Sequence, residues 1–190
     1  MAMMMDPDAF VSRCIECIAD GGGAREIAGL TRLALASQRE NGQAWGKAEV
    51  LYCAADLMIV DLTLPPFATS AIHEHNLWAV VGVSEGCEID ELLEEGGSGL
   101  VPTARHQLGA GDVLVLQPDC IHFIANPLAT PTRGIHVYGG NLGNVNRRMW
   151  DPATCVPRPM DFTVFEDWER ALTATSAAKG AIVGPAIHSR

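Results

Sequence analysis

Two histidines one residue apart, His73 and His75, are the residues of this sequence best placed to do chemistry. Residues i and i+2 of a β-strand point to the same face, so the two imidazoles can converge on one metal ion. Imidazole suits iron, zinc, copper and nickel. The alternative is a pair of polar residues on a solvated strand edge. The context favours the metal site, because prolines at 65–66 break the chain before the pair and an apolar strand, residues 77–83, follows it at once.

A third histidine, His122, follows a second strand-like stretch. Gly111 and Asp112 form a turn before the apolar run 113–116, and Pro118 ends that run. His122 then begins the next segment of the chain. This stretch therefore places another histidine beside a short apolar strand, as in the first stretch.

A histidine and a tyrosine, His136 and Tyr138, share one face of a later predicted strand, residues 133–139. A histidine two residues from a tyrosine can orient the phenol by hydrogen bonding. The alternative is a packed tyrosine and a core histidine that serve stability alone.

Composition bounds the kind of protein. The chain has 190 residues, 48% of them hydrophobic, and a formal net charge of -10. This length suffices for one domain with a substantial core. The acidic balance argues against nucleic acid as a partner, because such binding needs clustered Lys and Arg. No apolar run reaches the roughly eighteen residues of a membrane span, and the start of the chain lacks the regions of a signal peptide. We expect a cytoplasmic protein without a membrane partner.

The six cysteines are scattered, and we expect them to be reduced. Cys14 and Cys17 form a CxxC pair without a second CxxC to complete a zinc site. Apolar residues at helical spacing around Cys14 place it in a core instead.

The predicted elements position the candidate residues on a barrel of strands. Helices are predicted from Pro7 to about Ala19 and over 24–39, where they would cover one outside face of a sheet. Many short strands between Gly and Pro turns favour a mainly β sandwich or barrel. Residues 141–159 are expected to be mostly extended or loop, 161–178 to contain a short helix, and the last dozen residues to be a poorly ordered tail.

We therefore predict one domain over residues 1–190. Its parts are a helical cap at 1–47, a β-barrel at 48–160, and a C-terminal helix and tail at 161–190.

Together the first two histidine stretches resemble the two motifs of the cupin superfamily. The first motif is matched by His73, His75 and Gly86, with Ala79 where the motif has a glutamate. The second motif is matched by Gly111, Pro118, His122 and Asn126, with one residue fewer than usual between proline and histidine. The resemblance implies a double-stranded β-helix barrel, or jelly roll. It also implies a three-histidine metal site without a carboxylate ligand.

Over about residues 57–150 the chain is similar to the thiol dioxygenases of the cysteine dioxygenase family. The shared features are the HxHxxW pattern, the third histidine, and IHVYGGN with an arginine beyond it. The resemblance implies Fe(II) held by His73, His75 and His122. It also implies a Ser-x-His-x-Tyr relay beside the iron, which His136 and Tyr138 match, whereas Gly134 stands at the serine position.

The family also differs within itself in how it holds the substrate carboxylate. Arg147 matches the arginine of the bacterial 3-mercaptopropionate type, and Arg148 is its nearest rival. No arginine stands between 47 and 72, where the cysteine-specific animal type has one, and the glutamine usual in the bacterial type has no clear counterpart near Val50. Residues 77–84 hold no cysteine for the animal enzyme's Cys-Tyr crosslink, so we expect none.

The resemblance implies an enzyme whose partners are a small thiol acid, 3-mercaptopropionate or cysteine, and O2, with a sulfinic acid as product. We expect a monomer or homodimer. Two alternatives stay open, namely another metal-dependent cupin enzyme with a three-histidine zinc or iron site, and a non-catalytic cupin that binds a small acid or stores a metal. Fold alone decides none of them. His106 and His188 are expected on an exposed strand and in the tail, outside the metal site.

Overall fold

A hairpin of two helices opens the computed structural model, which describes residues 5–41, 49–97 and 99–187. The helices are α1 (Pro7–Ala19) and α2 (Ala24–Asn41), close to the predicted bounds. Helix α1 begins where Asp6 accepts a hydrogen bond from the Ala9 amide at 2.8 Å, with proline in its first turn. The chain turns between the helices at Gly21, whose φ of 82° suits glycine. The boundary expected near residue 47 lies outside the described residues.

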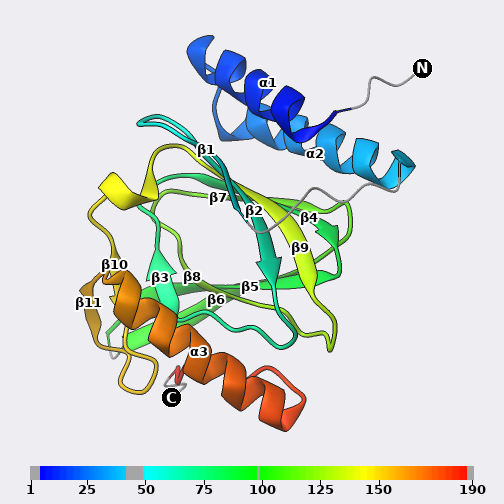
Figure 1. Cartoon of the computed structure of the whole chain (residues 1–190). Helices are drawn as coiled ribbons and strands as arrows, with labels where there is room; N and C mark the ends of the chain where they lie inside the picture. Colours follow the sequence, from blue (N-terminus) through cyan, green and yellow to red (C-terminus); the bar gives the residue numbers. More distant parts are fainter. Residues whose placement is uncertain (1–4, 42–48, 98, 188–190) are drawn as a thin grey trace.

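Two antiparallel sheets face each other and form the barrel (Figure 1). The five-stranded sheet has the order β1-β2-β9-β4-β7, and the six-stranded sheet the order β11-β10-β3-β8-β5-β6. In the first sheet the strands are β1 (Glu49–Cys53), β2 (Met58–Leu64), β4 (Ala79–Glu85), β7 (Val113–Leu116) and β9 (Thr132–Tyr138). In the second they are β3 (Ile72–Glu74), β5 (Cys87–Gly96), β6 (Gly99–Gly109), β8 (Ile121–Ala125), β10 (Arg148–Trp150) and β11 (Pro157–Pro159). The predicted mainly β jelly roll is confirmed.

Apolar side chains form three layers around these sheets, because successive residues of a strand point to opposite faces. The helices cover the outer face of the five-stranded sheet, as predicted, and Cys14 is buried there with no exposure. A second layer fills the barrel between the sheets and includes Ala79, Leu116 and Tyr138. A third layer lies on the outer face of the six-stranded sheet around Trp150.

The C-terminal third of the chain is more regular than predicted. Residues 141–159, which were expected to be mostly extended or loop, contain the 3-10 turn η1 (Leu142–Asn144) and two short strands, β10 and the edge strand β11. These strands form because β3 offers an open edge, on which Met149 pairs opposite His73. The helix predicted over 161–178 is α3 (Phe162–Lys179), and its 18 residues make it long rather than short.

The prediction of a poorly ordered tail is wrong for the described residues up to 187. Ile182 and Ile187 pack against the apolar layer on the outer face of the six-stranded sheet. The Ala186 amide also donates to the Pro152 carbonyl at 2.8 Å. The apolar outer face of the sheet supplies the burial that orders this segment. His188 lies outside the described residues.

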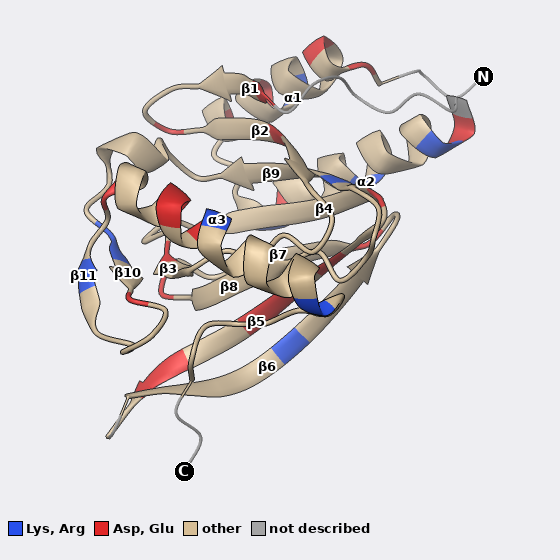
Figure 2. Ribbon diagram, turned by 60° about the horizontal axis from the view of Figure 1, so that its bottom comes forward, with Lys and Arg blue, Asp and Glu red and all other residues tan. Residues whose placement is uncertain are grey.

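Charge is distributed over both sheets and the helices (Figure 2). Figure 2 shows acidic residues along β5 and a basic residue on the neighbouring β6, where Arg105 pairs with Glu91 at 2.8 Å. None of the helices in the described ranges is long and apolar enough to cross a membrane.

Candidate metal centre

Three buried histidines meet inside the barrel. His73 on β3 lies opposite His122 on β8 in the antiparallel pairing, so both side chains point to the same face. His75 follows two residues after His73, just before Asn76 turns the chain at a φ of 54° toward β4 in the other sheet. The His75 Nε2 atom is 3.2 Å from that of His73 and 3.3 Å from that of His122. The sequence-predicted ligands are therefore brought together.

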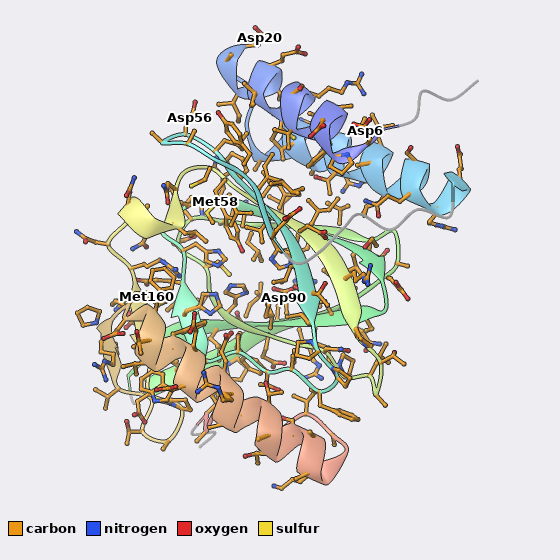
Figure 3. The ribbon with its side chains drawn as sticks, in the orientation of Figure 1. Asp6, Asp20, Asp56, Met58, Asp90 and Met160 are labelled. Atoms are coloured by element: carbon orange, nitrogen blue, oxygen red, sulfur yellow. The ribbon has the colours of Figure 1, made fainter. Side chains whose placement is uncertain are left out.

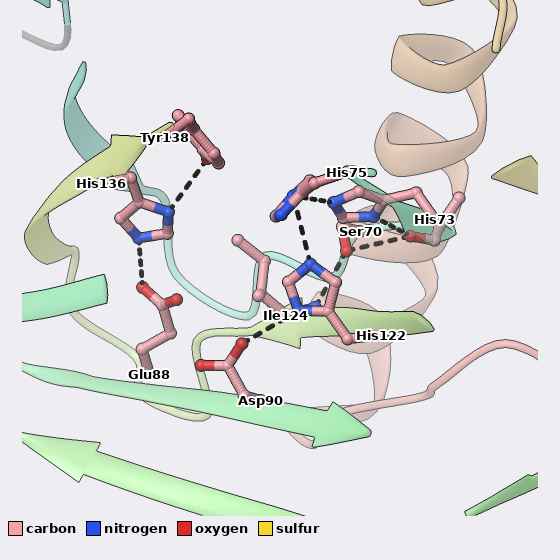
Figure 4. A network of polar contacts seen from close by, with 10 residues as sticks. Ser70, His73, His75, Glu88, Asp90, His122, Ile124, His136 and Tyr138 are labelled. Atoms are coloured by element: carbon pink, nitrogen blue, oxygen red, sulfur yellow. Dashed lines mark hydrogen bonds and ion pairs between the residues drawn. The ribbon is translucent and has the colours of Figure 1, made fainter. Parts of the chain in front are cut away.

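Contacts on the far side of two rings fix which nitrogen faces the cluster. His73 donates from Nδ1 to the Ala71 carbonyl at 3.0 Å, and His122 donates from Nδ1 to the Asp90 carboxylate at 3.0 Å (Figure 4). Because both partners accept, Nδ1 carries the hydrogen in each ring and Nε2 presents a lone pair. Figure 3 places Asp90 between the two sheets. A carboxylate behind a ligating histidine is the usual support of a metal-bound imidazole.

A cation among the three Nε2 atoms would be bound by the lone pairs that point to the centre of the cluster. The ligand atoms of the cluster lie within 4.8 Å of one another, which suits a single divalent ion. Burial holds the pKa of His73 and of His75 well below the usual histidine range, and the nearby His122 lowers it further. The rings therefore stay neutral, as metal ligands must be. These residues fit the metal that the sequence predicts.

No carboxylate joins the cluster among the described residues. Ala79 is fully buried in the layer inside the barrel and offers no donor atom. Glu74 points away from the histidines and accepts hydrogen bonds from Arg148. Glu85 lies exposed at the end of β4. The expected site of three histidines without an acidic ligand agrees with this arrangement.

A second chain of polar contacts lies beside the histidine cluster (Figure 4). The Tyr138 hydroxyl is 3.3 Å from His136 Nδ1, and His136 Nε2 is 3.2 Å from Glu88 Oε2. The Tyr138 ring also meets the His75 ring edge to face, with centroids 5.0 Å apart. Burial raises the pKa of Tyr138, so its hydroxyl keeps its proton. The predicted pair of His136 and Tyr138 thus reaches the candidate metal centre.

Opposing effects set the charge of His136. Burial disfavours its protonated form and lowers its pKa, but the Glu88 carboxylate and its hydrogen bond outweigh this effect. The net result is a pKa above the usual histidine value.

The pairing of β10 with β3 separates the two candidate arginines. Met149 lies opposite His73, and side chains alternate along the strand, so Arg147 and Arg148 point in different directions. Arg148 turns to Glu74 and Glu95, at 2.8 Å and 2.9 Å. Arg147 is buried, and its positive charge lowers the pKa of His73 and His75.

The guanidinium of Arg147 makes no hydrogen bond or ion pair with any residue in the described ranges, and its buried Nε atom has no partner. It lies 5.1 Å from the centre of the Phe162 ring at the start of α3. Burial lowers the pKa of Arg147, which nonetheless stays charged as arginines do. A buried arginine without a partner is a ready site for an anion.

A pocket of about 620 Å³ leads from the surface to Arg147. Its wall includes Asn76, Leu142 and Phe162. Farther along α3, Phe165 meets the His73 ring edge to face, with centroids 5.1 Å apart. Helix α3 therefore contributes Phe162 to the wall of this pocket and Phe165 to one side of the histidine cluster.

Sequence reasoning missed Glu88, Asp90, Phe162 and Phe165. Glu88 and Asp90 lie two residues apart on β5, and each is at most 1% exposed. Two acids at i and i+2 of a strand, separated by the apolar Ile89, were the available signal. The two phenylalanines act through the packing of α3, which the sequence pattern alone does not reveal.

The remaining sequence candidates lie away from the histidine cluster. Trp78, the tryptophan of the HxHxxW pattern, packs beside Gly139 and against the apolar layer under the helices. His106 lies on β6, partly exposed, as expected for a strand residue outside the site.

No family model matches the chain. Among solved structures it is similar to an uncharacterized conserved protein with a double-stranded β-helix domain from Klebsiella pneumoniae subsp. pneumoniae. The identity is 21%, the match covers 55% of this chain and 84% of that one, and the TM-score is 0.40. For the cupin domain of Schizosaccharomyces pombe Cnp3 the identity is 9%, the coverage 50% and 61%, and the TM-score 0.42.

A third similar structure is oxalate decarboxylase from Bacillus subtilis, with 20% identity over 46% of this chain and a TM-score of 0.39. The match spans only 22% of that enzyme's length. At such low identity and TM-score the likeness says nothing of activity, which must be argued from the site. The two facing sheets themselves define a cupin double-stranded β-helix, with a three-histidine cluster able to hold a metal.

Proposed function

We propose that the protein is an iron-dependent thiol dioxygenase that converts a small thiol carboxylic acid, 3-mercaptopropionate or cysteine, to its sulfinic acid. One observation carries the proposal. Three histidines able to hold a metal, a protonated tyrosine hydroxyl and an arginine without a partner among the described residues lie close together in the protein. A metal, a hydroxyl donor and an anion site are the three groups needed to hold a substrate with sulfur at one end and a carboxylate at the other.

The histidines would hold Fe(II) through their Nε2 atoms. When bound, Fe(II) supplies a 2+ charge that favours a thiolate over a thiol and open positions where sulfur and O2 can meet. The three neutral ligands leave that charge uncompensated, because no carboxylate of the described residues reaches the cluster.

Arg147 would bind the substrate carboxylate. A guanidinium can hold a carboxylate through two parallel hydrogen bonds. The side chain is largely buried, and it makes no hydrogen bond or ion pair with the described residues, which leaves its donors available to a carboxylate. A thiol without a carboxylate would leave this charge unpaired, which is unfavourable in an apolar interior.

Tyr138 would donate a hydrogen bond to an oxygen atom of the substrate. The edge-to-face contact between its ring and His75 supports this role, because His75 is one of the proposed metal ligands. His136 holds that hydroxyl from behind. The overall reaction, RSH + O2 → RSO2H, balances without a further reductant, so these residues need only bind, orient and exclude water.

Oxygen uptake by the metal-loaded protein tests the proposal. The iron-loaded protein is given 3-mercaptopropionate, cysteine or cysteamine in parallel, and the zinc-loaded protein is the control. We expect O2 consumption and a matching amount of sulfinic acid with the thiol acids, most with 3-mercaptopropionate, and little with cysteamine. The zinc form should consume none. No uptake with any of the three thiols would reject the proposal in favour of the zinc enzyme or the binding protein.

A further inference from the structure

A buried glutamate, Glu88, has a single described partner. Its side chain is 1% exposed, and only Oε2 makes a hydrogen bond, with His136 Nε2 at 3.2 Å. The other oxygen, Oε1, is buried without any partner in the described residues. Burying a carboxylate with one oxygen unsatisfied costs free energy, so Glu88 is a poor choice for stability alone.

Strand β5 carries two such acids toward two histidines. Asp90 lies two residues after Glu88 on the same face, and it accepts from His122, a candidate metal ligand. Glu88 crosses the interior in the same way, from the six-stranded sheet to His136 on β9 of the five-stranded sheet. One strand thus orients both the metal-binding histidine and the histidine that contacts Tyr138 (Figure 4).

No side chain on β9 can take the place of Glu88. The nearest position on the same face is Gly134, two residues before His136. A Cβ atom there would lie 2.7 Å from the Gly82 carbonyl oxygen of the paired strand β4. Because β4 and β9 are hydrogen-bonded to each other at this point, neither the added Cβ nor the carbonyl oxygen can move away without shifting the strands. The group that contacts His136 Nε2 comes instead from the opposite sheet, on β5.

We propose that Glu88 is the positioning residue behind Tyr138. It accepts a hydrogen bond from His136 Nε2–H, which leaves Nδ1 to accept from the Tyr138 hydroxyl. This fixes both the tautomer of His136 and the direction of the phenol toward His75. The assignment of a role in turnover rests on the proposed thiol dioxygenase function, whereas the fixed tautomer does not depend on any activity.

Matched variants on β5 separate positioning from general stability. Glu88→Ala removes the acceptor, and Glu88→Gln keeps an oxygen of the same reach that can still accept from Nε2–H. Glu91→Gln is the control, because Glu91 lies on the same strand but pairs at the surface with Arg105. The melting temperature of each variant reports folding.

The first readout is the tautomer of His136, measured by long-range 1H–15N NMR on the zinc-loaded, histidine-labelled protein, with His136→Gln used to assign the signal. We expect Nε2–H in the wild type, in Glu88→Gln and in Glu91→Gln. Glu88→Ala should lose this single tautomer. If Glu88→Ala keeps the wild-type tautomer, or if Glu88→Gln loses it while folded, the inference is wrong.

The second readout is the split between kcat and KM for 3-mercaptopropionate with the iron-loaded protein. Glu88→Ala should lower kcat by about 10- to 100-fold, the usual effect of losing an outer hydrogen-bond partner, with KM nearly unchanged. Glu88→Gln should restore most of kcat. An unaltered kcat in folded Glu88→Ala would overturn the role in turnover. A wild type that oxidises no thiol would instead reject the proposed function, and the NMR result would still decide whether Glu88 fixes His136.

Discussion

Individual buried side chains in this protein have their direction set by what lies behind them. His73 and His122 present Nε2 to the centre of the cluster because a carbonyl and a carboxylate accept from Nδ1. Tyr138 is held in the same way by His136. Arg147 is the exception, since nothing in the described residues accepts from it. Protein groups thus fix the orientation of the two histidines and of Tyr138, while Arg147 is left to bind a ligand.

The carboxylate behind His122 should tune metal affinity. Asp90→Asn keeps the shape and an accepting oxygen but removes the negative charge that makes the imidazole a better ligand. We expect metal affinity to fall by roughly 10-fold, the lower part of the range for such outer partners. Competition with a chelator of known affinity measures this. Asp112→Asn, on a turn remote from the cluster, is the control, and equal affinities of the two variants would contradict the role of Asp90.

Arg147 should decide the preference for thiol acids. Arg147→Ala is expected to raise KM for 3-mercaptopropionate by an amount equivalent to about 2–5 kcal/mol, because the carboxylate would be buried without a partner. The effect on cysteamine should be much smaller, since it has no carboxylate. Steady-state O2 uptake with both thiols measures the difference.

The neighbouring arginine provides the control for this prediction. Arg148→Lys keeps a positive charge facing Glu74 and should leave KM unchanged. Carboxylate recognition by Arg147 would have to be abandoned if Arg147→Ala left KM unaltered, or if it harmed all thiols equally.

At the level of elements, the sequence predicted where the strands lie better than it predicted which other elements contact the site. Alternation placed the HxH pair on one strand face, and the resemblance to cupins added His122. The structure pairs His73 directly opposite His122. Alternation does not reveal whether a strand face points into the barrel or to solvent. The inward orientation of Glu88 and Asp90 on β5 was therefore not predicted. The residues contributed by α3 were missed because their place depends on long-range packing, such as the contact of Phe165 with His73.

The close pairing of β4 and β9 requires glycine at position 134. Gly134→Ala would place a Cβ atom 2.7 Å from the Gly82 carbonyl oxygen, so the ladder must shift. We expect a loss of about 1–3 kcal/mol in the free energy of unfolding, typical of overpacking. Urea unfolding followed by circular dichroism measures it.

The matched control is Gly29→Ala in α2, where no atom lies within 4 Å of the added Cβ. This change should be neutral or stabilise by about 0.5–1 kcal/mol, because alanine favours a helix over glycine. Equal stabilities of the two variants would show that β4 and β9 are not packed as closely as described.

For the whole molecule, sequence pattern predicted the helical cap, a sandwich or barrel of short strands and the position of α3, and the resemblance to cupins implied the jelly roll. The packing of the segments on either side of α3 was not predicted, because it depends on surfaces made elsewhere in the chain. The apolar outer face of the six-stranded sheet is one such surface, and Ile182 and Ile187 cover it. Local pattern could not predict burial that arises only when the barrel is complete.

The pH dependence of global stability should include a contribution from Asp61. Burial raises the pKa of Asp61 from 3.8 to about 6, although nearby Arg133 opposes the shift. Between these values the folded protein binds the proton more tightly than the unfolded chain, so this contribution to stability falls as pH rises from about 4 to 6. Above that range the loss is complete and constant.

Asp61→Asn removes this titration. We expect the variant to be more stable than the wild type at pH 7 to 8, and the advantage to shrink as the pH is lowered toward 4. Thermal unfolding at a series of pH values checks the prediction. An advantage that does not change with pH, or a destabilised variant at pH 8, would show that burial does not raise the pKa of Asp61.

The central claim is that this barrel adds both atoms of O2 to the sulfur of a small thiol acid. The most direct test is turnover of 3-mercaptopropionate by the iron-loaded protein under 18O2, with the product analysed by mass spectrometry. The account predicts a sulfinic acid in which both oxygen atoms on sulfur carry the label. A product with oxygen from water, or a disulfide without added oxygen, would contradict it.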